Sequence, residues 1–339
     1  MRENECLIDF LRYSIPDSTR HYVVKHILGM DFSSFVTTPN SPFPSYDEKI
    51  VFANIEVHSS HNHNNILVNL SGKALRQYEE YMSAVDGWHW HEFIKVILAK
   101  GARVTRIDLA LDVFDESCPS VRTLQDYVKR GQLSTKCQTF KEINSGRVLD
   151  GVLTGFTLYI GALPQLLRIY DKMAERKANT GEIVLDTQKW VRWELELGNK
   201  KAMHVAEQIA KGVALNNIIR GILSAHYAFK TQQKGKKDFN NKSRWDNMRW
   251  WDKFISDIPK FPLRIKKAKT TMVEKENWLS HSVSKSLAMQ YKAYVTAYGE
   301  DYANQHLTAL LDYGYGNISK QDDAMIEQRV KELLGTEEY

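Results

Sequence analysis

Two segments of the sequence carry acidic side chains at strand-like spacing. In RIDLALD, Asp108 and Asp112 alternate with apolar residues, and in WVRWELEL, Glu194 and Glu196 do the same. Since side chains alternate across a β-strand, the two acids of each segment lie on one face. Carboxylate oxygens are the ligands that hard divalent cations prefer. The four acids are therefore candidate ligands of Mg²⁺ or Mn²⁺.

A third segment, LLRIYDK, places a phenol between two cations. Arg168, Tyr170 and Lys172 share one strand face in this pattern. An arginine fork and a lysine ammonium group both suit phosphate oxygens. A tyrosine has an ordinary pKa of about 10, so its hydroxyl is an effective nucleophile only where a base or nearby cations favour the phenolate. The segment has the parts of a tyrosine nucleophile beside a bound phosphate.

Each of these strands, taken alone, has a simpler explanation. Antiparallel sheets often have one solvated face, and polar residues at every second position are typical of it. Chemistry requires the three strands to be neighbours in one sheet, so that the acids of two strands meet the phenol of the third. Spacing along the sequence leaves both interpretations open.

The elements that would position these residues indicate an α+β fold. Apolar runs rich in branched residues predict strands, and apolar residues at spacings of three and four predict helices. The strands are expected at 50–57, 66–70, 103–113, 153–160, 166–172 and 190–197. The helices are expected at 75–82, 90–98, 120–130, 200–225, 246–256 and 284–311. We expect a mixed or antiparallel central sheet with helices on one side and a helical C-terminal region.

Composition excludes several classes of protein. The chain has 339 residues, 43% hydrophobic and 26% charged, which is typical of a globular protein of about two domains. Its three cysteines form no CxxC pair, so a disulfide scaffold and a cysteine-rich zinc module are excluded. The first residues lack the apolar core of a signal peptide, and no run of about 18 apolar residues occurs. We expect a cytoplasmic protein without membrane contact.

Positive charge is concentrated in one part of the chain. Residues 230–275 contain 14 Lys and Arg against five Asp and Glu, a local charge of +9, whereas the whole chain carries +5. Such a concentration is typical of a nucleic-acid contact surface, although a solvated lysine-rich linker explains it equally well. The candidate DNA-binding residues are Lys234, Lys236, Lys237, Lys242, Arg244, Arg249, Lys266, Lys267 and Lys269.

The same region predicts the domain organisation. The polar stretch KTQQKGKKDFNNKSR has no apolar periodicity and indicates a boundary. We expect a catalytic domain at 1–228, a basic linker at 229–245, and a mostly helical region at 246–339 that is a candidate for DNA recognition. Trp250 and Trp251 stand among cations and could stack on unpaired bases. Their spacing is better explained as the buried face of an amphipathic helix.

His89 and His91 offer an alternative metal site. A His-hydrophobic-His pair can hold a metal ion, and His89-Trp90-His91 has this form. The pair falls where a helix is expected to begin, and residues two apart diverge on a helix. We favour the carboxylates.

The order of the motifs resembles a known family. LVNLSGKALRQYEE, TRIDLALDVFD, GFTLYIG, LRIYDK and WVRWELEL follow one another as in the Rep_trans superfamily, and WDNMRWWDKFI resembles its C-terminal region. The resemblance covers residues 5–310. The superfamily includes rolling-circle initiators of small Gram-positive plasmids, phage replication initiation factors and relaxases of integrative conjugative elements.

The resemblance implies a reaction. Such enzymes nick one DNA strand through a tyrosine oxygen, become linked to the 5′ phosphate and leave a 3′ hydroxyl that primes synthesis. It implies Tyr170 as the nucleophile, Asp108, Asp112 and Glu194 as metal ligands with Glu196 in reserve, and a divalent ion that stabilises the transition state. It also implies that Lys172, Arg168 and Arg192 hold phosphates.

One departure from the family pattern concerns the tyrosine. Staphylococcal plasmid members resemble Y-E-K-x-Y-E at this strand, with a second tyrosine where this sequence has Ala174. The single-tyrosine pattern Y-D-K resembles phage and transposon members, so Tyr170 is the residue on which the prediction depends.

The resemblance leaves three functions open. We expect a rolling-circle replication initiator that binds a double-strand origin, forms a homodimer and works with a host helicase. A relaxase of an integrative conjugative element, which would act at a transfer origin with the same chemistry, is the first alternative. A non-catalytic DNA-binding repressor on the same scaffold is the second.

Overall fold

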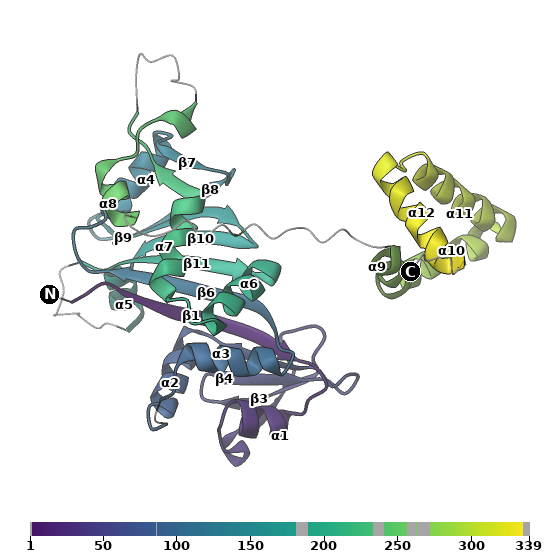
Figure 1. Cartoon of the computed structure of the whole chain (residues 1–339), viewed down its shortest axis with the longest axis horizontal. Helices are drawn as coiled ribbons and strands as arrows, with labels where there is room; N and C mark the ends of the chain where they lie inside the picture. Colours follow the sequence, from purple (N-terminus) through teal and green to yellow (C-terminus); the bar gives the residue numbers. More distant parts are fainter. Residues whose placement is uncertain are drawn as a thin grey trace. The chain divides into compact units, whose positions relative to one another are not determined.

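The computed structural model describes residues 2–85, 87–180, 189–232, 241–255, 263 and 272–334. The chain forms two compact units, Met1–Ile265 and Lys266–Tyr339 (Figure 1). The first unit contains the central sheet and all the residues proposed for catalysis. The second is helical.

Ten antiparallel strands form the central sheet, in the order β2-β3-β4-β5-β1-β6-β11-β10-β9-β8. The antiparallel form of the predicted sheet is therefore the one observed. Its strands are β1 (Glu5–Ile15), β2 (Val36–Pro39), β3 (Glu48–Phe52), β4 (Ile55–Ser59), β5 (Ile66–Leu70), β6 (Arg103–Val113), β8 (Phe140–Gly146), β9 (Leu153–Ala162), β10 (Gln165–Asp171) and β11 (Val191–Gly198). A separate two-stranded sheet pairs β7 (Leu133–Thr135) with β12 (Tyr227–Phe229).

Most helices of the first unit pack on one face of the sheet, as Figure 1 shows for α3, α6 and α7. The helices of this unit are α1 (Arg20–Tyr22), α2 (Gly72–Met82), α3 (Trp90–Ala99), α4 (Val121–Lys129), α5 (Lys172–Thr180), α6 (Asn199–Ala210), α7 (Leu215–His226) and α8 (Arg249–Ile255). The short helices η1 (Val23–Ile27), η2 (Phe32–Ser34) and η3 (Lys242–Arg244) complete it.

The two faces of the central strands differ because their residues alternate. Leu109, Trp193 and Ile169 point to the face covered by helices and are fully buried. Trp193 packs against Trp251 and Phe254 of α8, with ring centroids 6.0 and 5.2 Å away. The opposite face carries the charged residues of β6, β11 and β10, and we call it the polar face. The alternation read from the sequence is confirmed on all three strands.

Helix α8 belongs to the first unit, whereas the sequence placed it with the C-terminal region. The reason is its apolar side: Trp251 and Phe254 are 2% and 1% exposed and fill the core beside Trp193. Trp251 therefore lies on the buried face of an amphipathic helix, and Trp250 is partly buried against the same core. The functional division into a catalytic domain, a linker and a recognition region stays a prediction.

Three predicted elements are each divided by a turn. The segment 50–57 forms the end of β3 and the start of β4, joined at Ala53, whose φ of +49° turns the chain. The helix expected at 200–225 is broken at Gly212, where φ is +80°, and the one at 284–311 is broken at Gly299, where φ is +89°. Glycine adopts this left-handed conformation without steric cost, so it ends a helix there.

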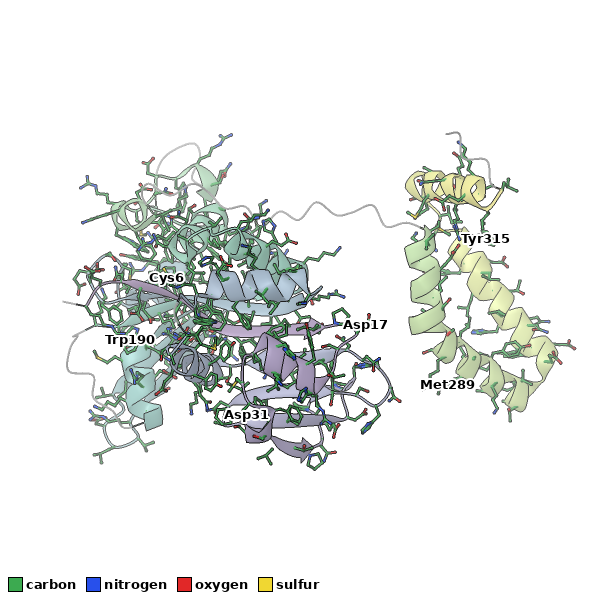
Figure 2. The ribbon with its side chains drawn as sticks, turned by 60° about the horizontal axis from the view of Figure 1, so that its bottom comes forward. Cys6, Asp17, Asp31, Trp190, Met289 and Tyr315 are labelled. Carbon is green, nitrogen blue, oxygen red and sulfur yellow. The ribbon has the colours of Figure 1, made fainter. Side chains whose placement is uncertain are left out.

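The second unit consists of α9 (Met272–Trp278), η4 (Leu279–Val283), α10 (Ser284–Tyr298), α11 (Glu300–Tyr315) and α12 (Lys320–Leu334). Arg329 ties α12 to α9 through both carboxylate oxygens of Glu276. Figure 2 shows Met289 and Tyr315 on this unit, and their side chains are 64% and 71% exposed. Within the described ranges, no helix is long and apolar enough to cross a membrane.

Candidate active site

The three strands that carry the predicted site residues are adjacent. β10 pairs with β11 and β11 pairs with β6, so Tyr170 lies opposite Arg192 and Arg192 lies opposite Asp112. Four residue pairs further along, Glu196 lies opposite Asp108. This adjacency is the condition that the sequence left open, and the structure meets it. The acids of two strands and the phenol of the third share the polar face.

Tyr170 is held by a carboxylate. Its hydroxyl donates a hydrogen bond of 3.0 Å to Oε2 of Glu194, and the residue is 8% exposed. Burial raises the pKa of Tyr170, and the Glu194 charge raises it further. Burial also raises the pKa of Glu194, although the charge of Arg168 opposes this shift. The phenol therefore keeps its proton at neutral pH, and the carboxylate beside it is placed to accept that proton.

Arg192 is engaged by two carboxylates. Its Nε and Nη2 each donate to Asp112 at 2.7 Å, and its Nη1 donates to Asp9 at 2.9 Å. Asp112 is fully buried, so this two-pronged contact compensates a charge that water cannot reach. The acids in turn raise the pKa of Arg192 although burial opposes this. In this arrangement the guanidinium of Arg192 binds carboxylates. That it binds phosphate stays a prediction.

Arg106 resolves a repulsion between two acids. Glu196 and Asp108 are direct neighbours across β11 and β6, and like charges in such positions are unfavourable. Arg106 bonds both oxygens of Asp108 at 2.9 and 2.6 Å and lies 3.1 Å from Glu196. Burial raises the pKa of Asp108 in spite of this partner.

Arg168 joins the acid cluster to the tyrosine. Its Nη2 lies 3.4 Å from Glu194 and 3.2 Å from Glu196, while its buried Nε has no hydrogen-bond partner in the structure. Its guanidinium carbon lies 5.7 Å from the ring centroid of Tyr159 on β9. Arg168 therefore has an unsatisfied donor next to the Tyr170–Glu194 pair, where a phosphate oxygen would be a suitable acceptor.

Lys172 stands where β10 passes into α5. Its Nζ lies 5.5 Å from the ring centroid of Tyr170 and 2.7 Å from Glu175. Gly155 of β9 belongs to the polar face, and a Cβ there would lie 3.8 Å from that of Ala174 on α5. This contact places α5 beside the site on the polar face, an exception to the helices gathered on the other side.

The N-terminal strand β1 supplies residues that the sequence analysis did not identify. Asp9 binds Arg192, and Arg12 lies opposite Arg106. A β-bulge between Ile8 and Phe10 interrupts the alternation of inward residues, which are Ile8, Leu11, Tyr13 and Ile15. The period of two begins only after the bulge, and that weak signal from Leu11 to Ile15 could have revealed the strand.

The carboxylates have the right chemistry for a hard cation but do not form a ready-made site. Among the residues that the structure describes, no three His, Cys, Asp or Glu side chains are grouped so as to hold a metal ion. Three guanidinium groups against five carboxylates leave a formal charge of −2 if all are ionised. Mg²⁺ is commonly held by one or two carboxylates together with substrate phosphates, so the donor set fits an ion that binds with DNA. The acids concerned are Asp9, Asp108, Asp112, Glu194 and Glu196.

The histidine pair lies at the beginning of α3. His89 precedes the first residue of α3, and His91 lies inside it. Their rings stack with centroids 5.7 Å apart, and His91 pairs with Glu92. This agrees with the helix start expected at this position.

The basic candidates divide into two groups. Lys242 and Arg244 lie on η3 and Arg249 begins α8, and all three are exposed on the first unit. η3 and α8 therefore each carry exposed cations of the predicted DNA-binding set. The others, Lys234, Lys236, Lys237, Lys266, Lys267 and Lys269, lie outside the described residues.

Comparison with known proteins identifies relatives over most of the chain. Residues 102–307 match the family model Rep_trans, described as "Replication initiation factor", and residues 5–96 match "Rolling Circle replication initiation protein N-terminal domain". "Putative DNA relaxase NicK" of Bacillus subtilis (strain 168) is 24% identical over 291 residues, which cover 85% of this chain and 81% of the relative. The solved "Structure of Rolling Circle Replication Initiator Protein from Geobacillus stearothermophilus" is similar with a TM-score of 0.66 and 23% identity, over 77% of this chain and 99% of that one. This last likeness shows a shared fold.

Proposed function

We propose that this chain nicks one strand of DNA at a double-strand origin and so starts rolling-circle replication. The chain belongs to the Rep_trans family of replication initiation factors. The segment that matches this family, residues 102–307, contains all the residues that we assign to catalysis. The observation that carries the proposal is the Tyr170 hydroxyl, which lies 3.0 Å from Glu194 next to the donors of Arg168.

In the proposed reaction the Tyr170 oxygen attacks the scissile phosphorus. The bond from phosphorus to the 3′ oxygen breaks, and a bond from phosphorus to the tyrosine oxygen forms. Glu194 accepts the phenolic proton, and the departing 3′ oxygen takes up a proton to become the primer hydroxyl. One phosphodiester replaces another of similar energy, so the step needs no ATP and can reverse to rejoin the ends.

The electrostatics of the site favour proton transfer during attack. Burial raises the pKa of Tyr170, so a free phenolate is a minor species at neutral pH. The pKa of Glu194 is raised as well, which makes its carboxylate a better proton acceptor than an ordinary glutamate. Arg168 and Lys172 would offset the charge of the incoming phosphate, and Arg192 holds the acids of β6 and β1 in place.

A divalent ion is part of the proposal. Asp108, Asp112, Glu194 and Glu196 would hold Mg²⁺ or Mn²⁺ together with the DNA, and the ion would supply a Lewis acid that polarises the non-bridging phosphate oxygens. The formal surplus of negative charge in the cluster supports this assignment.

The test uses supercoiled DNA that carries the gene and its flanks, incubated with Mg²⁺ or Mn²⁺. The wild-type chain should yield nicked circles, and mass spectrometry after reaction with a single-stranded suicide oligonucleotide should find the nucleotide on the Tyr170 peptide. Tyr170→Phe should abolish both products and still bind DNA. Tyr159→Phe is the matched control, because Tyr159 lies on the same face opposite Arg168. An adduct that persists in Tyr170→Phe would refute the assignment.

A relaxase of an integrative conjugative element is the second candidate. The similarity to a relative whose name reads DNA relaxase, over 85% of this chain, favours it. Cleavage of a transfer origin in preference to a replication origin would decide for the relaxase. Wild-type protein that binds but never cleaves either DNA would instead identify a repressor. A homodimer and a helicase partner stay predictions.

A further inference from the structure

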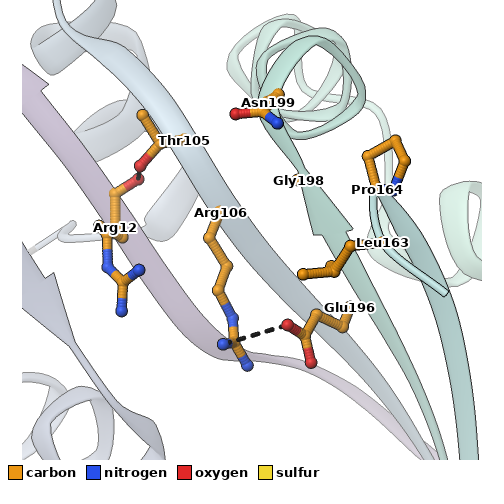
Figure 3. A pocket seen from close by; sticks show the side chains of 8 residues that line it. All are labelled: Arg12, Thr105, Arg106, Leu163, Pro164, Glu196, Gly198 and Asn199. Atoms are coloured by element: carbon orange, nitrogen blue, oxygen red, sulfur yellow. Dashed lines mark hydrogen bonds and ion pairs between the residues drawn. The ribbon is translucent and has the colours of Figure 1, made fainter.

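A cavity lies on the polar face beyond the carboxylate cluster (Figure 3). Its volume is about 300 Å³, at the lower end of the range of roughly 300–1,000 Å³ for ligand pockets. Arg12, Arg106, Glu196 and Asn199 are among the residues that line it. Glu196 also contacts Arg168, which approaches the Tyr170–Glu194 pair. Glu196 therefore connects the wall of the cavity with the proposed nicking site.

Two arginines line this cavity, and carboxylates balance the charge of only one of them. Arg12 and Arg106 are direct cross-strand neighbours, an unfavourable arrangement for like charges. Arg106 is balanced by Asp108 and Glu196. In the described part of the chain, no carboxylate forms an ion pair with Arg12, which bonds only the amide of Asn69 through Nε and lies over the rings of Phe10 and Phe43.

The charge of Arg12 is costly where it stands. Burial lowers the pKa of Arg12, and the neighbouring Arg106 lowers it further. The terminal nitrogens of Arg12 have no hydrogen bond to a described residue, so they can serve an anion that enters the cavity. An anion between the two guanidinium groups would reduce their repulsion and accept hydrogen bonds from the terminal nitrogens of Arg12.

The opposite wall of the cavity is also suited to an anion. Asn199 is the first residue of α6, and no side chain caps this helix. The first amide groups of a helix carry partial positive charge and favour anions. Asn199 and Glu196 are the polar residues of this wall, and the Glu196 carboxylate is directed at Arg106.

We propose that this cavity is a second phosphate subsite, which holds a backbone phosphate of the single strand on one side of the nick. The register places Arg106 six residues along the sheet from Asp112, which is level with Tyr170; this corresponds to roughly 20 Å along a strand. The subsite therefore holds a phosphate some nucleotides away from the one attacked. It rests on the proposed function, because the strand must reach Tyr170 as well.

The experiment measures binding without cleavage. Oligothymidylates of increasing length, each with a fluorescent end, are titrated by anisotropy into the full chain carrying Tyr170→Phe. We expect Arg12→Gln to weaken binding about tenfold and to reduce the salt slope of log K by about 0.7, the value for one phosphate contact on a single strand. Only oligonucleotides long enough to reach the cavity should show the loss.

A neutral phosphate identifies the contact. One methylphosphonate is placed at each position of a long oligonucleotide in turn. At one position the substitution should weaken binding to the Tyr170→Phe protein and have no further effect once Arg12→Gln is present. Independent losses at every position would refute the subsite, since the arginine and that phosphate would not be coupled.

A second variant guards against misfolding, because Arg12 also packs on two aromatic rings. Asn199→Asp adds a negative charge to the cavity wall while favouring the start of α6, and asparagine and aspartate both tolerate its φ of +52°. Asn199→Asp should weaken the binding of long oligonucleotides, as Arg12→Gln does. Arg103→Gln is the control: this exposed arginine lies three residues from Arg106 on β6, and it is not among the residues that line the cavity. Its affinity should be unchanged.

The outcomes separate this inference from the proposed function. If the methylphosphonate coupling is found but wild-type protein never cleaves, the subsite stands and the nicking proposal fails. If cleavage occurs at Tyr170 but no position couples to Arg12, the subsite is refuted. Binding of thymidine monophosphate or inorganic phosphate that depends on Arg12, without any effect on oligonucleotides, would identify a site for a free phosphate and overturn the assignment to a strand.

Discussion

Replacement of Arg192 by leucine is expected to destabilise the first unit by about 3–5 kcal/mol, the usual cost of leaving a buried charge without its partner. Arg192 is 6% exposed and makes both of its 2.7 Å hydrogen bonds to Asp112, which is fully buried. Its third contact is to Asp9, whose side chain is 21% exposed, so water compensates that loss in part. Most of the cost therefore comes from Asp112.

Urea unfolding followed by tryptophan fluorescence measures this cost. Seven of the eight tryptophans lie before residue 266, so the signal reports mainly on the first unit. For a unit of this size, each kcal/mol corresponds to about 2–4 °C in Tm, so the midpoint of a thermal scan should fall by roughly 6–20 °C. Arg103→Leu, an exposed change on neighbouring β6, should stay within about 0.5 kcal/mol of the wild type.

A double variant tests the reason for the loss. Adding Asp112→Asn to Arg192→Leu removes the buried charge that the single change leaves behind, so the pair should recover at least part of the stability. Two costs that simply add would show that the charges are not coupled. A loss below about 1 kcal/mol for Arg192→Leu would refute the reasoning altogether, because it would mean that Asp112 does not depend on the guanidinium.

Three further predictions concern Glu194, the metal ion and the exposed basic residues. Glu194→Gln should lower the single-turnover nicking rate about 10²- to 10⁴-fold, as expected for loss of a general base. Burial raises the pKa of Glu194 above its ordinary 4.5, so the protonated group stabilises the fold below that value, and this stabilisation is lost as pH rises through the folded pKa. Glu194→Gln should therefore flatten that part of the plot of unfolding free energy against pH. An unchanged plot would show that burial of Glu194 is not the cause. Chelation by EDTA should abolish nicking, restored by Mg²⁺ or Mn²⁺, and calorimetry should detect tight Mg²⁺ binding only when DNA is present; cleavage that persists in EDTA would exclude the metal. The double change Lys242→Gln with Arg249→Gln should reduce the salt slope for origin duplex by about 1.8, two contacts at about 0.9 each, and an unaltered slope would remove both residues from the DNA surface.

The alternation of residues along β6, β10 and β11 was sufficient to predict their two faces. Asp108 and Asp112 share one side because the side-chain period of a strand is two, and no packing partner alters this. The same rule failed for β1, where the bulge beside Phe10 shifts the period. The position of α8 in the core could not be predicted from spacing, because it depends on Trp193 from a distant strand. Glycines at 212 and 299 divided two helices because their left-handed backbone angles interrupt a pattern that apolar spacing alone would continue.

By itself, the sequence determined which residue types could do chemistry and which of them share a strand face, since both follow from local geometry. Only the tertiary structure decided that Tyr170 meets Glu194, that Arg106 separates two opposed acids, and that Asp9 and Arg12 of the first strand belong to the same surface. The reason is physical: strand order and register are set by the burial of the apolar face against helices from remote parts of the chain, and the charges on the other side take their partners from that order.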